Sequence, residues 1–303
     1  SMTYYLLANP NSGAGKGART LEILIPYLEK NNYEYRLFKT NAPSEEGDLV
    51  KQILELKVAE DHLVIIGGDG TISLVINELP EEEAFSYIPS GSGNDFARSL
   101  NLILDPIESF EAARSGMNHE IFIMNYQSKG LNGYALNNIG IGLDAAIVQA
   151  ANEGKLKQFL NKLKLGSFSY ILTALHVLIT KKAFPALIEI ENQQISLEKT
   201  FLMTFTKHPY FGGGVKISPE ASNQNADIHL VEYSKHSLFR TFSLIPSVLR
   251  GTHLKHPLFL HRVNPHFSVE LAESQPVQID GEIHHLAAAD RLSISTEKRM
   301  IIY

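Results

Sequence analysis

The sequence contains no cysteine among its 303 residues. This absence excludes disulfide bridges, cysteine-ligated zinc sites, iron–sulfur clusters and thiol nucleophiles, and it fits a reducing cytoplasm. A long apolar run is also missing, because the longest one, near residues 171–180, is far shorter than the ~20 residues needed to cross a bilayer. No signal peptide is evident. We therefore predict a soluble, cytoplasmic protein.

An excess of positive charge is lacking as well. The 27 lysine and arginine residues are outnumbered by 33 acidic residues, which leaves a net charge of −6. Residues 1–118 carry 18 acidic against 9 basic side chains, whereas residues 119–303 carry a small basic excess. This change, together with the chain length, predicts two domains, residues 1–118 and 119–303, with different partners. The negative net charge and the absence of a known nucleic-acid module argue against nucleic acid as a partner.

Short apolar runs alternate with helical patterns through the first domain. Leucine and isoleucine recur at positions 21, 24, 25 and 28, which is the spacing of one helix face. Strands that alternate with helices form a parallel sheet, so we predict a doubly wound α/β domain. The expected strands are residues 4–8, 33–40, 62–66 and 85–88, and the expected helices are the leucine-rich segment and residues 44–58, 71–79, 95–100 and 106–115.

The second domain has a different pattern, with many short strands between turns and few helices. This pattern favours a β-rich, sandwich-like domain. The expected strands are residues 120–125, 134–141, 186–191, 200–205, 227–231, 267–271, 277–280 and 292–295, and the expected helices are residues 155–179 and 238–249.

The most informative segment is Gly-Gly-Asp-Gly-Thr at residues 67–71, between a predicted strand and a predicted helix. We expect Gly67, Gly68 and Gly70 to adopt positive φ angles and to let the backbone approach a phosphate, which the free N–H groups of the helix start would also bind. The carboxylate of Asp69 would repel that phosphate. A Mg²⁺ ion between the two removes the conflict, so the segment predicts a site for a metal and a phosphate.

Two further glycine-rich loops follow predicted strands. Residues 9–17 (NPNSGAGKG) follow the first strand, and residues 89–98 (PSGSGNDFAR) follow the fourth. The first is not a Walker A loop, because Lys16 is followed by Gly17 and not by serine or threonine. Ligands of a doubly wound sheet bind at the carboxyl ends of its strands. The three loops are therefore expected to form one site.

These loops occur together with NNIGIGLDA at residues 137–145, GGGVKISPEA at 212–221 and DGE at 280–282. In these motifs the chain resembles the diacylglycerol kinase catalytic family, the bacterial lipid kinases related to sphingosine and ceramide kinases. The resemblance implies the two-domain fold of NAD kinases and diacylglycerol kinases. It also implies Mg²⁺-dependent transfer of the γ-phosphate of ATP to a lipid hydroxyl, most specifically from diacylglycerol to phosphatidic acid in phospholipid biosynthesis.

The resemblance further implies roles for single residues. Glu282 matches the family's proton acceptor, and Asp280 and Asp69 match members of a carboxylate and magnesium network. Whether Asp280 or Glu282 is the base stays open, and without the family residues 280–282 would be interpreted as a hairpin turn. The positions that match ATP contacts are Asn9, Pro10, Asn11, Ser12, Gly13, Thr40, Gly67, Gly68, Asp69, Gly70, Thr71, Ser92, Gly93 and Asn94.

The sequence departs from the family pattern at an expected metal site. That site would consist of Ser222, Asn225 and Asp227, besides the metal contact of Asp69. Asn225-Ala226 stands in place of the family's Asp-Gly pair. The site thereby loses a carboxylate, which Asp227 would replace only in part, and a less charged set of oxygen ligands binds Mg²⁺ more weakly.

Membrane contact is expected at residues 155–165, where lysines alternate with leucine and phenylalanine. This pattern suits a helix lying on the anionic headgroups of the inner membrane face, and equally a helix packed on its own domain with solvated lysines.

Two other functions stay open. An NAD kinase shares the GGDGT motif but phosphorylates a soluble ribose. Leu74 stands where a glutamate is usual in the helix after GGDGT, and together with Asn225 it leaves room for a non-catalytic nucleotide- or lipid-binding protein. The acceptor lipid also stays open, and so does the oligomeric state, for which a homodimer is one alternative.

Overall fold

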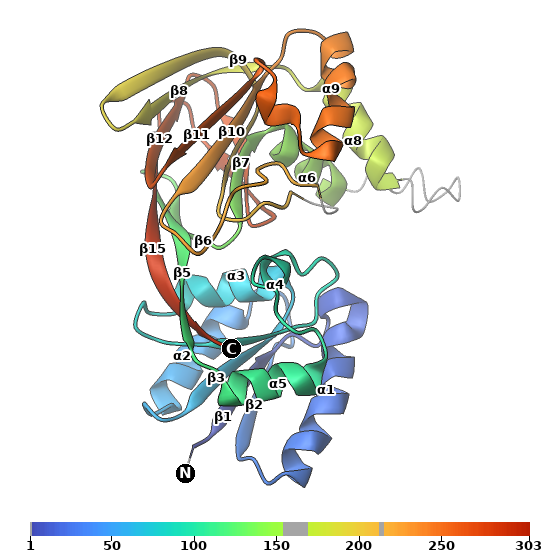
Figure 1. Cartoon of the computed structure of the whole chain (residues 1–303), viewed down its shortest axis with the longest axis vertical. Coiled ribbons are helices and arrows are strands. Elements are labelled where there is room, and N and C mark those ends of the chain that lie inside the picture. The colour runs from blue at the N-terminus through green and yellow to red at the C-terminus, as the bar shows by residue number, and fades with distance from the viewer. Residues whose placement is uncertain (1, 154–168, 212–214) are drawn as a thin grey trace. The chain divides into compact units, whose positions relative to one another are not determined.

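The structure of the protein is a computed structural model that describes residues 2–153, 169–211 and 215–303, arranged in two compact units (Figure 1). The N-terminal unit comprises residues 1–123, 223–225 and 297–303, and the C-terminal unit comprises residues 124–222 and 226–296. Each unit has its own hydrophobic core. The chain therefore returns to the N-terminal unit twice after first leaving it.

The N-terminal unit is built on a four-stranded parallel sheet with the order β2-β1-β3-β4. Its elements are β1 (Tyr4–Ala8), α1 (Ser12–Lys30), β2 (Tyr35–Lys39), α2 (Glu46–Leu56), β3 (His62–Gly67), α3 (Asp69–Glu78), β4 (Ser86–Pro89), α4 (Asp95–Ser99) and α5 (Pro106–Ser115). The predicted alternation of strands and helices is confirmed. Every β-to-α turn consequently lies at the same edge of the sheet, because parallel strands end on one side.

Helices cover both faces of this sheet (Figure 1). On one face Leu6 of β1 and Val64 of β3 pack against Leu24 of α1 and Phe110 of α5. Helices α2 and α3 contact each other and the strands on the other face. Side chains alternate between the faces along each strand, so a strand covered on both sides is apolar throughout, as the fully buried run in β3 illustrates.

The C-terminal end of the chain belongs to the N-terminal unit, which the sequence analysis did not predict. The last residues of β15 (Leu292–Ile302) lie beside Phe85, next to β4. The Phe85 amide donates to the Met300 carbonyl at 3.2 Å, and the Ile302 amide donates to the Phe85 carbonyl at 2.8 Å. The chain terminus thus extends the edge of the sheet at β4.

The C-terminal unit is rich in antiparallel β-structure, as predicted. Its sheet follows the order β14-β13-β7-β9-β8-β12-β15-β5-β6, with β10 pairing with β9 and β11. The elements are β5 (Asn118–Gln127), β6 (Asn132–Ala135), β7 (Asn138–Gly142), α6 (Leu143–Glu153), α8 (Ser169–Thr180), β8 (Phe184–Ile190), β9 (Gln193–Thr206), β10 (Ile228–Ser234), α9 (Leu238–Arg250), a 3-10 turn η2 (His253–Lys255), β11 (Phe259–Asn264), β12 (His266–Leu271), β13 (Gln275–Ile279) and β14 (Glu282–Leu286).

The long strand β9 lets this sheet fold over one core. Its first half pairs with β8, and its second half, from Thr200 to Thr206, pairs with β10 and with β7. The core between the strands contains Met203, Phe205, Phe267 and Val277, all fully buried. Within the described parts of the chain, no helix combines the length and the hydropathy needed to cross a bilayer.

Several predicted elements differ from the structure. The strand expected at residues 134–141 is divided into β6 and β7, because the backbone amides between them donate to a side chain and not to a neighbouring strand. Strands β11 and β14 and helix α6 were not predicted. Helix α9 matches the helix expected at residues 238–249, and α8 matches the last part of the one expected at 155–179. The segment 155–165 and the first glycines of the motif at 212–221 lie outside the described residues.

Candidate functional site

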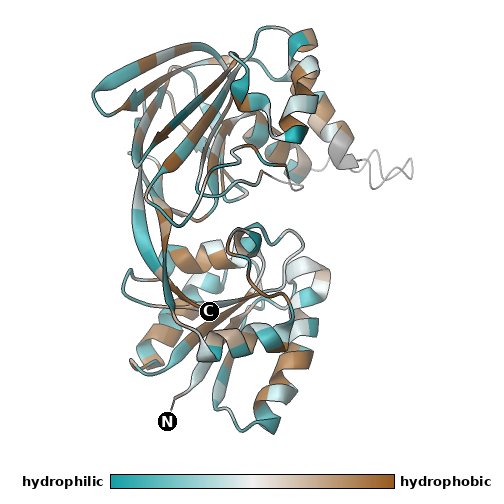
Figure 2. Ribbon diagram, viewed as in Figure 1, coloured by the Kyte–Doolittle hydropathy of each residue, from teal (hydrophilic) through white to brown (hydrophobic). Residues whose placement is uncertain are grey.

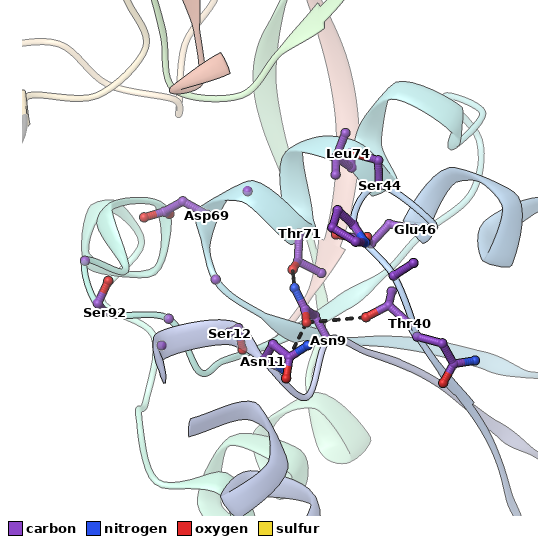
Figure 3. Close-up of a pocket in the computed structure, with 18 residues that line it drawn as sticks. Asn9, Asn11, Ser12, Thr40, Ser44, Glu46, Asp69, Thr71, Leu74 and Ser92 are labelled. Carbon is purple, nitrogen blue, oxygen red and sulfur yellow. Dashed lines mark hydrogen bonds between the residues drawn. The ribbon is translucent and has the colours of Figure 1, made fainter. Parts of the chain in front are cut away.

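A pocket of about 520 Å³ lies at the carboxyl ends of β1, β3 and β4 in the N-terminal unit (Figure 3). The three predicted glycine-rich loops meet there, as the strand order requires. The residues that line the pocket are Asn9, Asn11, Ser12, Gly13, Thr40, Asn41, Ala42, Pro43, Ser44, Glu46, Gly68, Asp69, Gly70, Thr71, Leu74, Gly91, Ser92 and Gly93. Of the positions expected to contact ATP, Pro10, Gly67 and Asn94 do not line it.

Asn9, directly after β1, joins three of the pocket's segments (Figure 3). Its Oδ1 accepts hydrogen bonds from the Asn11 amide at 3.0 Å and from the Thr40 hydroxyl at 3.3 Å. Its Nδ2 donates to the Thr71 hydroxyl at 3.3 Å. One amide side chain therefore links the ends of β1 and β2 to the first turn of α3, which explains an asparagine at this position.

Ser12 and Gly13 join the first loop to the loop after β4. The buried Ser12 hydroxyl lies 2.8 Å from the Ser90 hydroxyl and donates to the Ser90 carbonyl at 3.3 Å. Gly13 has a φ of +57°, and a Cβ there would lie 2.5 Å from the Ser90 carbonyl oxygen. Gly13 is thus required both by its conformation and by the close approach of the two loops.

Asp69, in the first turn of α3, binds the loop after β4 through both of its oxygens. Its Oδ2 accepts from the Asp95 amide and its Oδ1 from the Phe96 amide, each at 3.0 Å. The side chain therefore satisfies two amides at the start of α4 that have no partner within that helix. A metal ion is consequently not the only reason for a carboxylate at this position.

The charge of Asp69 also acts on its neighbour. Burial raises the pKa of Asp95, the negative charge of Asp69 raises it further, and Arg98, 3.5 Å away, opposes both effects. The pocket is lined by a second carboxylate, the buried Glu46 in the first turn of α2. Two carboxylates in a pocket would disfavour a phosphate unless a cation accompanied it. Each oxygen of Asp69 has one amide partner and retains a lone pair, so Asp69 fits a Mg²⁺ ion that also contacts a phosphate.

The glycines of the GGDGT segment differ from the expectation. Positive φ angles occur at Gly13 and Gly15 but not at Gly67, Gly68 or Gly70, so that prediction was wrong. At Gly67 and at Gly91 the reason for glycine is a lack of space for a side chain. A Cβ on Gly67 would lie 2.5 Å from the side chain of Thr71, and a Cβ on Gly91 would lie 2.6 Å from the Cα of Gly68. A Cβ on Gly70 would meet nothing within 4 Å.

Asn94 shapes the loop after β4 without lining the pocket. It has a φ of +52°, which asparagine tolerates better than most residues. Its Oδ1 accepts from the Gly91 amide and its Nδ2 donates to the Gly91 carbonyl, both at 3.0 Å. Behind it, the Tyr87 hydroxyl donates to the Gly67 carbonyl at 2.8 Å. The loop is thereby held against the end of β3.

The segment after β2 contributes residues that the sequence analysis missed. Asn41, Ser44 and Glu46 line the pocket, although only Thr40 was expected from this part of the chain. The predicted parallel sheet could have indicated these residues. Strand β2 lies beside β1 in this sheet, so its carboxyl end must lie at the same edge.

The two carboxylates expected at the DGE turn have different surroundings in the C-terminal unit. Asp280 has a φ of +49° and accepts from three consecutive backbone amides. The distances are 2.7 Å from Leu136, 2.8 Å from Asn137 and 3.1 Å from Asn138. Glu282, the first residue of β14, is exposed to solvent. Asp280 therefore holds the turn, and Glu282 projects from it.

A buried network next to this turn was not assigned from the sequence. Gln278 donates through Nε2 to Asn138 Oδ1 at 2.6 Å and to Asp144 Oδ2 at 3.0 Å, and its Oε1 accepts from the Gly281 amide at 2.9 Å. Burial raises the pKa of Asp144 to about 6, and its bond from Gln278 opposes that shift. A Cβ on Gly140 would overlap Asp144 Oδ2, so any larger residue there would displace the Asp144 carboxylate.

The metal site expected at Ser222, Asn225 and Asp227 stays a prediction. Asn225 belongs to the N-terminal unit, whereas Ser222 and Asp227 belong to the C-terminal unit. Across residues 2–153, 169–211 and 215–303, no three histidine, aspartate or glutamate side chains group as a metal ion would require. The neutral amide of Asn225 replaces the carboxylate of the family pattern, so these residues do not fit Mg²⁺.

The C-terminal unit also contains an apolar pocket of about 150 Å³. Its lining is almost entirely aliphatic and aromatic and comes from α6, α8, β9, β10, α9 and β11, with the segment between β9 and β10. The lining residues are Leu143, Leu178, Phe201, Leu202, Phe211, Ile217, Tyr233, Thr241, Leu244, Ile245, Val248 and Phe259.

Two family models match the chain along most of its length. The diacylglycerol kinase catalytic domain matches residues 3–126, and the YegS C-terminal NAD kinase beta sandwich-like domain matches residues 137–292. The chain belongs to the diacylglycerol kinase catalytic family. It is therefore a kinase of a lipid kinase family, for which ATP is the implied phosphate donor.

Relatives within this family have consistent names. YtlR of Bacillus subtilis (strain 168), named as a candidate lipid kinase, is 27% identical over 83% of this chain and 84% of its own length. The diacylglycerol kinase of Staphylococcus carnosus (strain TM300) is 26% identical over 91% of this chain and 87% of its own. A crystal structure titled as a candidate diacylglycerol kinase from Bacillus anthracis str. Sterne matches with a TM-score of 0.76 and 19% identity, over 100% of this chain and 95% of that chain. That match supports the fold.

Proposed function

We propose that this protein is a Mg²⁺-dependent diacylglycerol kinase, which transfers the γ-phosphate of ATP to the hydroxyl of diacylglycerol and releases phosphatidic acid for phospholipid synthesis. We place it in the cytoplasm, at the inner face of the membrane. The observation that carries the proposal is the pocket in which Asn9, Ser12 and Asp69 join three glycine-rich loops at the edge of a parallel sheet.

The phosphates of ATP would lie over Gly68, Gly70 and Gly93, beside the start of α3. Backbone amides and the positive end of the helix dipole favour an anion there. Because glycine has no side chain, the phosphates can approach the backbone closely. Asp69 would hold the Mg²⁺ ion, which would neutralise the charge of the phosphate oxygens when bound. The Thr40 and Thr71 hydroxyls, both fixed by Asn9, complete the walls of the site.

Glu282 is the proposed proton acceptor for the lipid hydroxyl. A general base needs a carboxylate whose oxygens can reach the substrate. Both oxygens of Asp280 already accept backbone amides, whereas Glu282 is exposed at the start of β14. The choice between the two residues therefore favours Glu282 as the base and Asp280 as the residue that positions it.

The apolar pocket of the C-terminal unit suits an acyl chain. Its walls include Leu178 of α8 and Leu244, Ile245 and Val248 of α9, and hydrocarbon gains free energy when such walls remove it from water. A soluble ribose is polar and would gain nothing from an apolar pocket of this kind. The pocket therefore favours a lipid acceptor over NAD.

Helices α8 and α9 carry several hydrophobic residues (Figure 2), and those that are exposed favour contact with a membrane. In α8, Leu172, Leu175 and Ile179 are exposed on one helix face, at the spacing i, i+3 and i+7. In α9, Phe242 is 39% exposed and Phe239 is 84% exposed. Exposed hydrophobic residues concentrated on two helices mark an interaction surface.

The charges around α9 suit an anionic bilayer. Residues 234–269 contain Lys235, Arg240, Arg250, Lys255 and Arg262 and no acidic residue. Basic residues near a negatively charged membrane surface contribute about 1 kcal/mol each. Hydrophobic side chains on α8 and α9 would enter the interface, while the arginines of α9 would contact the headgroups.

The proposal is tested with γ-labelled ATP and a panel of acceptors. Vesicles of phosphatidylglycerol would carry diacylglycerol, a sphingoid base or a polyprenol, pure phosphatidylglycerol would test that lipid itself, and NAD would be supplied in solution. We expect labelled phosphatidic acid from diacylglycerol, dependent on Mg²⁺ and lost in Asp69→Ala. Labelled NADP, or ATP binding without any labelled product, would contradict the proposal.

A further inference from the structure

A lysine ammonium is buried beside the expected metal site at residues 222–227. Lys207 follows the last residue of β9, and its side chain is fully buried. Asp227 precedes the first residue of β10. The two strands are antiparallel, with Thr206 opposite His229, so Lys207 and Asp227 lie at the same end of the pair. The Lys207 ammonium donates a hydrogen bond to the Asp227 carbonyl oxygen.

The positive charge of Lys207 interacts with the negative charge of the Asp227 side chain. Burial lowers the pKa of Lys207 to about 8, and the negative charge of Asp227 opposes that shift. The pKa of His229 falls to about 4, chiefly by burial, with further contributions from His261 and from the positive charge of Lys207. The buried position of Lys207 and its hydrogen bond to the Asp227 carbonyl thus place its ammonium at the start of β10.

Two features of this chain thus oppose a divalent cation at the loop. Asn225 supplies no negative charge where the family pattern has aspartate, and Lys207 brings a positive charge to the carbonyl of Asp227. An ammonium has three donors for oxygen acceptors, which is the same preference for oxygen ligands that Mg²⁺ has. A second cation close to the ammonium would be repelled, because few water molecules screen charges in a buried site.

We propose that Lys207 takes the place of the metal ion in this chain, so that the segment before β10 is held by an internal ammonium and does not bind Mg²⁺. The chain would then have lost the aspartate at 225, a metal ligand, and gained the buried lysine, which replaces the metal ion. The inference concerns the stability of the protein, so it does not depend on the proposed substrate.

The test uses the full chain without nucleotide, because the phosphates that would complete a Mg²⁺ site at Asp69 are then absent. The unfolding temperature is measured by calorimetry after treatment with EDTA and again in 5 mM MgCl₂. We expect the wild-type midpoint to agree within about 1 °C between the two conditions. A wild-type protein that loses several degrees in EDTA and regains them with Mg²⁺ would overturn the proposal.

Lys207→Met removes the charge and the donors but keeps a long side chain. We expect its midpoint to fall by roughly 5 °C in both conditions, because a buried carbonyl loses its charged partner. Lys199→Met is the matched control, since Lys199 is an exposed lysine of the same strand. Equal midpoints for the two variants would contradict a structural role for the ammonium. If Lys207→Met does not fold, the wild-type comparison still decides the question.

The double variant Lys207→Met/Asn225→Asp sharpens the test. It removes the ammonium and restores the carboxylate of the family pattern. We expect its midpoint to rise by several degrees on addition of Mg²⁺ and to fall again with EDTA, whereas Lys207→Met alone responds to neither. A double variant that ignores Mg²⁺ would mean that the ammonium does not occupy the place of a metal.

Discussion

The nucleotide loops and the DGE turn both depend on an aspartate, but the two aspartates have different consequences. Asp69 binds two amides of a segment that itself lines the pocket, so this carboxylate is part of the site's wall. Asp280 binds three amides between β6 and β7 and leaves Glu282, two residues later, exposed. The role of a carboxylate is therefore better judged by what its oxygens already bind than by the motif that contains it.

The largest effect is expected for Glu282→Gln. If Glu282 is the base and does not contribute to stability, the variant should lose about 10²–10⁴-fold in kcat, with little change in the KM for ATP. Its unfolding temperature should stay within about 1 °C of the wild type, because the side chain is exposed. The exposed Glu273→Gln is the control for the loss of one charge. Activity within twofold of the wild type would assign the base elsewhere.

Asp280→Asn should have the opposite profile, with a loss of stability that accompanies any loss of activity. Asparagine offers one acceptor oxygen, and its NH₂ group would face a backbone amide. We expect the free energy of unfolding to fall by about 3 kcal/mol, because three backbone amides depend on this partly buried, charged acceptor. Urea denaturation measures this directly. An unchanged midpoint with a large loss of kcat would make Asp280 the reactive carboxylate instead.

Asp144→Asn tests the buried network beside the turn through the pH dependence of stability. Burial raises the pKa of Asp144 to about 6 in the folded chain, so between pH 4 and pH 6 the native state binds more protons than the unfolded state. The contribution of Asp144 to stability is therefore present at low pH and is lost as the pH rises to about 6. Relative to the wild type, the variant should gain up to about 2.5 kcal/mol between pH 4 and pH 7.5. Unfolding free energies that differ by the same amount at both pH values would contradict the assignment.

The smallest effects are expected for Gly91→Ala and Gly70→Ala, two substitutions in the glycine-rich loops. A Cβ at Gly91 would lie 2.6 Å from the backbone of Gly68, whereas a Cβ at Gly70 would meet nothing within 4 Å. We expect Gly91→Ala to lose about 1–2 kcal/mol of stability, and Gly70→Ala to stay within 0.5 kcal/mol. Thermal unfolding of both variants decides whether contact between the loops, and not φ, is the reason for glycine.

The sequence predicted the pocket at the edge of the parallel sheet more completely than the surroundings of the DGE turn, for a physical reason. In a parallel sheet every β-to-α loop lies at one edge, so glycine-rich loops at residues 9–17, 67–71 and 89–98 had to converge. The pairing order of an antiparallel sheet depends instead on contacts between distant segments. The strand predicted at 134–141 is interrupted because Asp280, more than 140 residues away, accepts its amides.

Other features could not be predicted because they depend on packing and not on pattern. The end of β15 joins the N-terminal unit through hydrogen bonds to Phe85, a contact between residues more than 200 positions apart. Gly67 and Gly68 are explained by close approaches to Thr71 and Gly91, which depend on packing distances that the sequence does not contain. Lys207 belongs to no recognised motif, and only its burial in the structure indicates a structural role.

We propose that the pocket at the carboxyl ends of β1, β3 and β4 binds the triphosphate of ATP. A crystal structure with Mg²⁺ and a non-hydrolysable ATP analogue tests it most directly. We predict phosphates over Gly68, Gly70 and Gly93, with the cation on Asp69 and the Thr40 hydroxyl facing the nucleotide. An empty pocket in a crystal that binds the analogue at another place would contradict the account.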